Sequence, residues 1–179
     1  MVIIRPFLSD WATFQFKRFA VNNITLYSIS DSELLFLQKN LYVPGAASLC
    51  QDHLGNSLVG LKAGERFTGG LYELVPQGLL DPSETFENAL ERELLEETGL
   101  SFNNLDCNQP THMCWGEAYG DFMVVSRLRI KSGEEDKIQL SEEHDSLAFK
   151  TPDEIQSLNR YLLNPVSVHI LESAGLRDK

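Results

Sequence analysis

The chain has few cysteines, and their spacing does not support a cysteine-based framework or metal site. Cys50, Cys107 and Cys114 form an odd set without a CxxC pair. A disulfide framework and a zinc knuckle are therefore poorly supported, because both require cysteines in matched positions. Reduced thiols are the expectation, as in most proteins of the cytoplasm.

The sequence also lacks a long hydrophobic run. The only apolar run in the first ten residues, Val2-Ile3-Ile4, is much shorter than the hydrophobic core of a signal peptide. No segment approaches the roughly 18 apolar residues of a membrane-spanning helix. Internal repeats and low-complexity tracts are absent as well. We therefore expect a soluble, cytoplasmic protein that does not associate with membranes.

Positive charge is scarce, since 15 Lys and Arg residues face 26 Asp and Glu residues, for a net charge of -11. This balance works against nonspecific binding to nucleic acid or to anionic lipid, so neither is an expected partner. Two segments, residues 84–97 and 134–145, each hold six acids and one base. The acidity is therefore local, and these segments are the first places to look for a functional site.

Length and composition are otherwise those of an ordinary globular domain. The chain has 179 residues and a mass of 20.2 kDa, with 42% hydrophobic and 23% charged residues. Folding at this length buries roughly 70% of the surface that the unfolded chain exposes. Neither a metal nor a disulfide is needed to hold such a fold, so any metal is expected to serve chemistry.

Local patterns predict strands and helices in alternation. Strands are predicted by alternation and short apolar runs at residues 46–51, 57–62, 71–75, 122–131 and 147–150. A cap followed by proline predicts helices at residues 82–98, capped by Asp81 and ended by Gly99, and from Pro152 and Pro165, the last ending near Gly175. This order predicts an α/β fold with a mixed sheet between helices.

The first part of the chain is predicted to be an appendage to the main unit. Residues 1–44 contain a strand-like start, a predicted strand at about residues 24–29 and a predicted short helix at residues 32–40. Pro44 and Gly45 then interrupt the pattern. We therefore predict an N-terminal appendage at residues 1–44 and a main domain at residues 45–179.

The C-terminal end of the helix predicted at residues 82–98 contradicts the rules of helix stability. At 100° per residue, Glu93, Glu96 and Glu97 share one arc of its last turns. Carboxylates at this end oppose the helix dipole, and Glu93 and Glu97 repel each other. A solvated acidic face is the plain alternative, but Phe86 and Leu90 share the arc and indicate partial burial. Clustered, half-buried carboxylates favour a hard divalent cation, Mg²⁺ or Mn²⁺.

The same residues resemble the signature of a known family. Gly78, Glu84 and the run Arg-Glu-Leu-Leu-Glu-Glu-Thr-Gly-Leu at residues 92–100 match the Nudix box, G-x5-E-x7-R-E-U-x-E-E-x-G-U with U aliphatic, at every fixed position. The chain is therefore similar to the Nudix hydrolase superfamily, loosely over residues 46–176. This resemblance implies a Nudix-type α/β/α sandwich with a mixed sheet. It also implies an enzyme that cleaves a nucleoside diphosphate linked to another moiety.

The resemblance implies roles for individual residues. The implied metal ligands are Glu93, Glu96, Glu97 and the backbone carbonyl of Gly78. Arg92 would orient these carboxylates, and Glu84 would be structural rather than catalytic. Glu73, just upstream of the box, is a further candidate metal ligand. All of these residues lie within one stretch of the chain, residues 73–97.

The identity of the general base stays open between two regions. One choice is Glu93, and the other is Glu142 or Glu143 in the second acidic segment, which resembles the distal loop of the family. The alternative for that segment is a solvated acidic loop. The neighbouring His144 is expected at the surface rather than as a ligand.

Candidates for substrate binding lie outside the box. Arg66, in a glycine-rich loop, is a candidate to contact a phosphate. The aromatic candidates are Tyr72, Trp115 and Tyr119, with packing in the core as the alternative for Trp115 and Tyr119.

The leading hypothesis is metal-dependent hydrolysis of a diphosphate linkage in a nucleotide derivative, such as a nucleotide sugar or an ADP-ribose-like compound. One alternative is an enzyme like isopentenyl diphosphate isomerase, which needs an active-site Cys and Glu. The other is a noncatalytic nucleotide-binding sensor, which would not require all three carboxylates. The expected partner is a small nucleotide, and a homodimer is left open.

Overall fold

The computed structural model describes residues 17–21, 24–28, 44–65, 68–81, 84–116 and 121–178. Its strands, in chain order, are β1 (Lys17–Val21), β2 (Ile24–Ser28), β3 (Pro44–Gln51), β4 (Ser57–Lys62), β5 (Tyr72–Leu74), β6 (Gln77–Leu79), β7 (Leu105–Gly116), β8 (Asp121–Ile130) and β9 (His144–Lys150). Its helices are α3 (Phe86–Thr98), α4 (Pro152–Ser157) and α5 (Pro165–Ser173), with short 3₁₀ turns η2 (Phe102–Asn104), η3 (Glu135–Lys137) and η4 (Arg160–Leu162).

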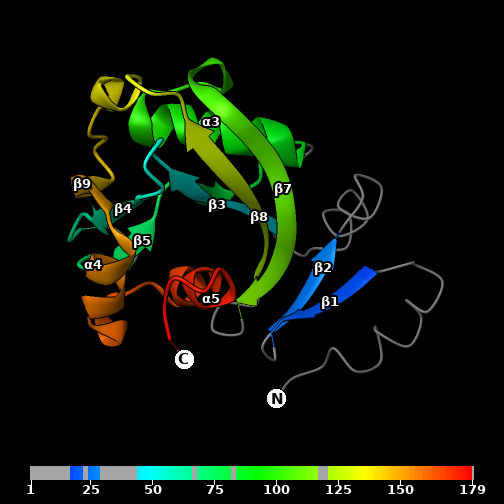
Figure 1. Ribbon diagram of the computed structural model, residues 1–179. Coiled ribbons are helices and arrows are strands. Elements are labelled where there is room, and N and C mark those ends of the chain that lie inside the picture. The colour runs from blue at the N-terminus through cyan, green and yellow to red at the C-terminus, as the bar shows by residue number, and fades with distance from the viewer. Residues whose placement is uncertain are drawn as a thin grey trace.

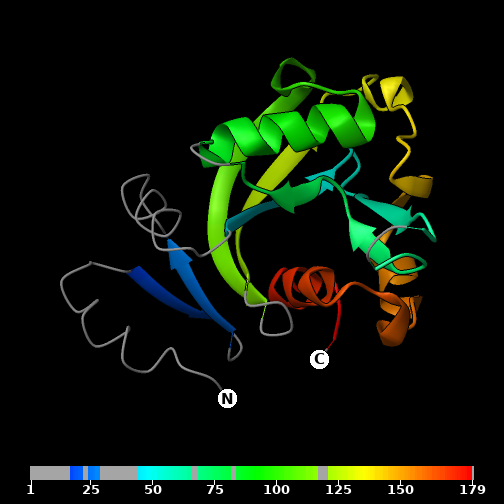
Figure 2. The same cartoon turned by 180° about the vertical axis from the view of Figure 1, so that it is seen from behind.

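The strands form one mixed sheet in the order β1-β2-β7-β8-β3-β4-β5, with β6 paired to β3 and β9 paired to β4. Strands β3 and β8 run parallel, and the other named pairs are antiparallel. Helix α3 crosses one face of the sheet and α5 covers the other (Figure 1, Figure 2). The predicted α/β/α sandwich with a mixed sheet is therefore confirmed.

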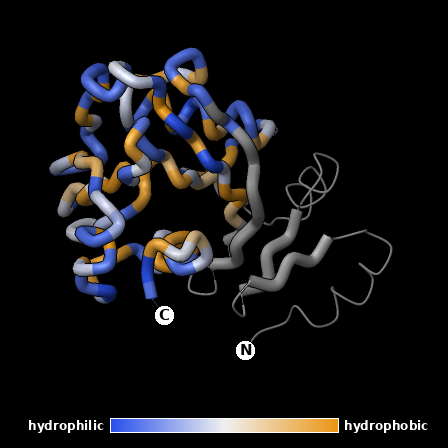
Figure 3. Tube along the Cα trace, viewed as in Figure 1, coloured by the Kyte–Doolittle hydropathy of each residue, from blue (hydrophilic) through white to orange (hydrophobic). Residues whose placement is uncertain are grey.

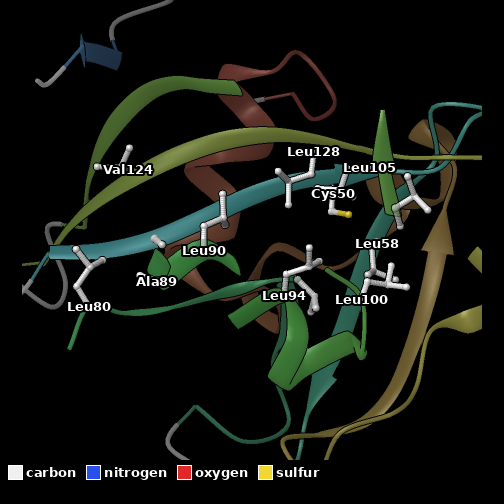
Figure 4. Packing of buried hydrophobic residues seen from close by; sticks show 13 residues of the cluster. Cys50, Leu58, Leu80, Ala89, Leu90, Leu94, Leu100, Leu105, Val124 and Leu128 are labelled. Carbon is white, nitrogen blue, oxygen red and sulfur yellow. The ribbon is translucent and has the colours of Figure 1, made fainter. Parts of the chain in front are cut away.

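Two hydrophobic clusters fill the spaces between these layers. The first cluster packs Ala89, Leu90 and Leu94 of α3 against Cys50 and Leu128 of the sheet (Figure 4). The second lies on the opposite face and joins α5 to the sheet through buried Val, Leu and Ile side chains. Figure 3 shows hydrophobic segments in the strands and α5 and hydrophilic ones at many outer turns. In the described ranges no helix has the length and apolarity required to span a bilayer.

Most predicted elements are present, and both C-terminal helices begin where their caps predict. Thr151 caps α4 in a capping box with Glu154, and the Asn164 side chain accepts a hydrogen bond from the Val166 N–H at the start of α5. Strand β4 has the predicted bounds, whereas β9 begins three residues earlier than predicted. This earlier start brings His144 into the sheet.

The predicted start of the long helix is wrong. Helix α3 begins at Phe86, and its N-cap is Thr85, whose Oγ1 accepts a hydrogen bond from the N–H of Asn88 at 3.2 Å. Glu84 lies ahead of the helix, and its carboxylate is bound by Arg92. The predicted end is confirmed, since Gly99 adopts φ 72° and its N–H donates to Leu95 O.

The described part of the N-terminal segment continues the sheet. Strands β1 and β2 form a hairpin, and β2 joins β7 through the pair Tyr27 and Met113. The long strand β7 was not among the predicted strands, although it pairs with β8 along ten registered positions. The short helix predicted at residues 32–40 lies outside the described residues.

The first cluster predicts a large difference between two adjacent leucines of α3. The side chain of Leu94 is fully buried, whereas Leu95 is 56% exposed. Leu94→Ala is expected to lower the free energy of unfolding by about 2–5 kcal/mol, because it leaves a cavity under the helix. Leu95→Ala should change it by less than about 0.5 kcal/mol. Urea unfolding of both variants measures the difference, and equal losses would contradict the assigned face of α3.

Candidate metal centre

The Glu97 carboxylate is the most deeply buried acidic group of α3, with 1% of the residue exposed. One oxygen, Oε2, accepts a hydrogen bond from the backbone N–H of Gln77 at 3.0 Å. The other oxygen, Oε1, is buried and has no hydrogen-bond partner in the described part of the chain. Burial first, and then the charges of Glu73 and Glu93, raise the pKa of Glu97 well above its ordinary value.

Glu93 lies one turn earlier on α3 and packs directly over Gly78 of β6. A Cβ atom at position 78 would lie only 1.9 Å from Glu93 Oε1, so any side chain there would displace the Glu93 carboxylate. Strand β6 is held by its antiparallel pairing with the start of β3. Burial raises the pKa of Glu93, although Arg92 opposes this effect. The glycine therefore allows the backbone of the sheet to approach the helix carboxylates, as the sequence motif implies.

Arg92 organises the outer side of this carboxylate group. Its Nε and Nη2 bind the two oxygens of Glu84 at 3.0 Å each. Its Nη1 donates to Glu93 Oε1 at 2.7 Å and to Glu96 Oε2 at 3.1 Å. The hydrogen bonds from Arg92 lower the pKa of Glu84. Arg92 thus joins Glu84, Glu93 and Glu96 in one hydrogen-bonded group, and the roles implied for Arg92 and Glu84 stay predictions.

Glu96 is the most exposed of the predicted metal ligands, with 58% of its side chain exposed. Arg92 holds it beside Glu93, and no other contact of its carboxylate is present among the described residues. Glu93, Glu96 and Glu97 therefore extend from the solvent to the interior along one face of α3.

A second group of side chains faces Glu97 from the sheet. Glu73 of β5 is 2% exposed, and its Oε1 accepts a hydrogen bond from His144 Nε2 at 3.0 Å. Lys62 Nζ lies 3.1 Å from the same oxygen. One ligand atom each of Glu73, Glu97 and His144 lie within 4.8 Å of one another. The expectation that His144 lies at the surface is wrong, because its side chain is fully buried.

Lys62 was not among the candidates from sequence, yet it links this group to the second acidic segment. Its Nζ donates to Glu143 Oε2 at 2.7 Å while also contacting Glu73. Burial lowers the pKa of Lys62, but its bonds to Glu143 and Glu73 outweigh burial and raise it. Of the two predicted distal carboxylates, Glu143 therefore reaches the site, whereas Glu142 is exposed and takes no part in these contacts.

The substrate-binding candidates are not brought together with the carboxylates in the described part of the chain. Tyr72 packs against the second hydrophobic cluster, and its ring centroid lies 6.0 Å from Lys150 Nζ. Since strand residues alternate, Tyr72 points away from the face that Glu73 occupies. Arg66 and Tyr119 lie outside the described residues. Trp115 belongs to β7, but its side chain is outside the description.

The arrangement fits a divalent cation. Glu93 and Glu97 present oxygens beside the carbonyl-bearing backbone of Gly78, and Glu97 Oε1 lacks any donor among the described residues. A buried acceptor without a donor is costly unless something positive reaches it. Hard, closely spaced oxygen donors of this kind suit Mg²⁺ or Mn²⁺.

The raised pKa of Glu97 predicts how the stability of the metal-free protein depends on pH. The folded state retains the proton at pH values where the unfolded chain has lost it, above the ordinary value of 4.5. The free energy of unfolding should therefore fall as pH rises from that value through the raised pKa. Glu97→Gln should weaken this fall, since the amide does not ionise. Urea unfolding in the presence of a chelator, at about pH 5 and about pH 8, measures the change in the free energy of unfolding for the wild type and for Glu97→Gln. An equal change in the two proteins would contradict the prediction.

Comparisons with known proteins agree with the motif and the fold. The model of the NUDIX domain matches residues 43–172. The NAD-capped RNA hydrolase NudC of Pasteurella multocida (strain Pm70) is 36% identical over 87 residues, which are 48% of this chain and 30% of that protein. The protein of the same name from Haemophilus influenzae (strain PittEE) is 37% identical over 83 residues, or 45% of this chain and 29% of that protein. The chain thus spans less than a third of the length of these relatives.

Solved structures share the fold at low sequence identity. A NUDIX hydrolase from Nitrosomonas europaea matches with a TM-score of 0.55 and 22% identity, covering 75% of this chain and 88% of that one. The MutT protein from Methanosarcina mazei Go1 matches with a TM-score of 0.53 and 17% identity, covering 75% and 92%. Since the NUDIX domain model spans most of the sequence, including every carboxylate of the site, the chain belongs to the NUDIX domain family.

Proposed function

We propose that this protein is a Mg²⁺-dependent pyrophosphohydrolase that cleaves the diphosphate linkage of a nucleoside diphosphate derivative. The observation that carries the proposal is the buried Glu97 carboxylate, whose Oε1 has no donor among the described residues while Glu93 lies one turn away over Gly78. A helix whose sequence served stability alone would not carry buried acids near its C-terminal end, because they oppose the helix dipole.

The excess of negative charge in the site favours binding of a cation, and a bound cation would allow a diphosphate to bind beside it. Four carboxylates of the site are met by two cations: Lys62 interacts with Glu73, Glu143 and Glu97, and Arg92 pairs with Glu93. A diphosphate would be repelled by this group unless a cation neutralised both sides. A divalent ion bound here would supply that neutralisation and activate a water for attack at phosphorus.

Each side chain has a separate task in the proposed reaction. Glu97 and Glu93 hold the cation together with the Gly78 carbonyl, and Glu96 adds an outer oxygen. Arg92 fixes the rotamers of Glu93 and Glu96 through hydrogen bonds of 2.7 and 3.1 Å. This positioning lowers the entropy that the carboxylates lose when the cation and substrate bind.

Two carboxylates remain candidates for the general base. Glu143 lies at the edge of the site on Lys62 and has a part-exposed side chain, which leaves it accessible to a water. Each of the two is paired with a cation at 2.7 Å, Glu93 with Arg92 and Glu143 with Lys62. We favour Glu143, because its side chain is 42% exposed against 12% for Glu93, and a base has to pass the proton that it accepts on to solvent.

The substrate class rests on the relatives' names and on charge. The curated relatives are named NAD-capped RNA hydrolases, and NAD contains a diphosphate between two nucleosides. The net charge of -11 disfavours a long nucleic-acid footprint. We therefore propose a small nucleoside diphosphate derivative, such as an NAD-type dinucleotide, an ADP-ribose-like compound or a nucleotide sugar.

The isomerase alternative requires a reactive cysteine. Cys50, the cysteine whose side chain is described, is fully buried in the first hydrophobic cluster. Burial, followed by the charge of Asp52, raises the pKa of its thiol to about 12. Such a thiol is unsuited to proton transfer or nucleophilic attack at neutral pH. Cys50 therefore does not supply the reactive cysteine that isomerisation requires, and the side chains of Cys107 and Cys114 lie outside the described residues.

A nucleotide panel with and without Mg²⁺ tests the proposed function. The panel contains ADP-ribose, NAD, a nucleotide sugar and NAD-capped RNA, and release of nucleoside monophosphate is measured. Glu97→Gln is expected to lower kcat by about 10³-fold or more, because the cation loses its buried ligand. Glu91→Gln is the matched control, since Glu91 is an exposed acid of the same helix.

The outcomes of this panel are distinct. The assignment of Glu97 as a metal ligand is supported if cleavage requires Mg²⁺, is abolished in Glu97→Gln and is retained in Glu91→Gln. Unchanged turnover in a folded Glu97→Gln variant would overturn the metal role of Glu97. Absence of cleavage for every compound, with tight nucleotide binding, would favour the sensor alternative.

The distal segment offers a second matched pair. Glu143→Gln is expected to lower kcat by about 10²-fold or more, because a general base contributes on that order. Glu142→Gln should leave kcat within about twofold, since its side chain is exposed and outside the cluster. Steady-state kinetics on the best substrate of the panel compares them. A larger loss in Glu142→Gln would reverse the assignment.

A further inference from the structure

The inner side of Glu97 differs chemically from its outer side. Outward lie the carboxylates of Glu93 and Glu96, whereas inward lie Glu73 and the imidazole of His144. One ligand atom from each of Glu73, Glu97 and His144 falls within 4.8 Å of the others, and all three residues are buried. A nitrogen donor therefore joins two carboxylate oxygens on this side.

The fold makes a specific place for the imidazole. His144 pairs with Lys62 at a β-bulge, where the register between β4 and β9 shifts. The ring lies over Gly60, at which a Cβ atom would be only 2.4 Å from His144 Cδ2. Gly60 thus leaves room that any other residue would fill. The ring is fixed against the backbone of β4 with its Nε2 directed at Glu73.

The distances suit two ligands of one ion. His144 Nε2 and Glu73 Oε1 are 3.0 Å apart. Neighbouring ligands at about 2.1 Å from a metal and at right angles are separated by about 3 Å. Glu73 Oε2 is anchored separately by Gln77 Nε2 at 2.7 Å and Asn164 Nδ2 at 3.3 Å. Oε1 is thus the oxygen that faces His144, and Lys62 Nζ lies 3.1 Å from it.

An independent indication of a cation site comes from two unpartnered acceptors. Glu97 Oε1 and Gln77 Oε1 are both buried without a hydrogen-bond partner among the described residues. Glu97 is 1% exposed, so bulk water does not satisfy it. Such groups are rare in native structures and usually indicate an ion or an ordered water.

We propose that Glu73, Glu97 and His144 form an inner cation site with mixed nitrogen and oxygen ligands, which takes a divalent transition-metal ion such as Mn²⁺. Imidazole nitrogen favours these ions over Mg²⁺, which prefers oxygen ligands alone. The ion shares Glu97 with the outer carboxylates, so the inner site deepens the proposed function and rests on its assignment of Glu97 as a ligand.

The residues around His144 are arranged so that its Nε2 can bind the ion. A metal-bound Nε2 carries no hydrogen, so the neutral ring then holds its hydrogen on Nδ1. Ser141 Oγ lies 3.4 Å from Nδ1 and is placed to accept that hydrogen. Lys62, now 3.1 Å from Glu73 Oε1, would be displaced toward its stronger partner Glu143 at 2.7 Å.

Pulsed electron paramagnetic resonance of Mn²⁺ tests this proposal without relying on turnover. The full-length protein, free of any histidine tag, is loaded with less than one equivalent of Mn²⁺. Electron spin echo modulation from a directly bound histidine nitrogen is expected in the wild type, and labelling histidine with ¹⁵N should shift it. His53→Gln is the matched control, since His53 is exposed and contacts Glu135 instead.

His144→Gln should abolish the nitrogen modulation and weaken Mn²⁺ binding by about tenfold or more, while Mg²⁺ affinity changes little. The inner site is overturned if the nitrogen modulation persists in His144→Gln. It is also overturned if the wild type binds Mn²⁺ without a histidine nitrogen. Where His144→Gln does not fold, a labelled wild type that binds Mn²⁺ without any histidine nitrogen still overturns the inner site. Nitrogen ligation without cleavage of any nucleotide would instead retain this site and remove the proposed hydrolase activity.

Discussion

Burial of the Glu97 carboxylate is the constraint on which the site depends. A carboxylate with 1% exposure loses most of its hydration, and a single backbone N–H at 3.0 Å does not replace it. Its position at the end of α3 adds an unfavourable interaction with the helix dipole. The packing of Leu90 and Leu94 beneath the same helix offsets these terms, since both side chains are fully buried. The hydrophobic face of α3 thus holds an acid where its chemistry is needed.

The two sides of α3 divide the task of positioning these acids. Toward solvent, Arg92 binds Glu84, Glu93 and Glu96, so that one guanidinium sets the direction of three carboxylates. Toward the sheet, Gln77 donates to both Glu97 and Glu73, through its backbone N–H and its side-chain amide. Lys62 is the charged donor on this side, with its Nζ 3.1 Å from Glu73 Oε1. Its charge does not satisfy Glu97 Oε1, which has no hydrogen-bond donor among the described residues.

Much of the fold and the helix half of the site could be predicted from the sequence, because they depend on local patterns. The spacing from Gly78 to Glu97 lies within one loop and one helix, so it identified the carboxylates directly. The start of α3 was mistaken because Asp81 and the proline after it form a good local cap, whereas the pairing of Glu84 with Arg92 acts over eight residues. Local cap rules do not include such a pairing.

The sheet half of the site depends on long-range pairing and was partly missed. Strict alternation from Leu147 would turn His144 away from the face that Leu147 and Phe149 share. The bulge opposite Leu61 and Lys62 reverses that alternation and turns the ring inward. Lys62 was missed because lysine is usually a surface residue, and its partners lie in β5 and the distal loop. The useful signal was Gly60, a glycine inside a strand pattern, which indicates close approach of another group.

Lys62 reduces the repulsion between the buried carboxylates of the site, because its ammonium contacts two of them. Its ammonium lies between Glu73 and Glu143 and is the nearest positive charge to the inner carboxylates among the described residues. A single charge shared between two acids lowers their repulsion but leaves Glu97 Oε1 without a donor. Replacing a monovalent by a divalent charge near three carboxylates improves the Coulomb energy, since each acid then has a closer and stronger partner. The lysine is therefore a counter-ion of the inner carboxylates, and in the proposed function its flexible chain of four methylene groups would let it stay with Glu143 while a divalent cation binds.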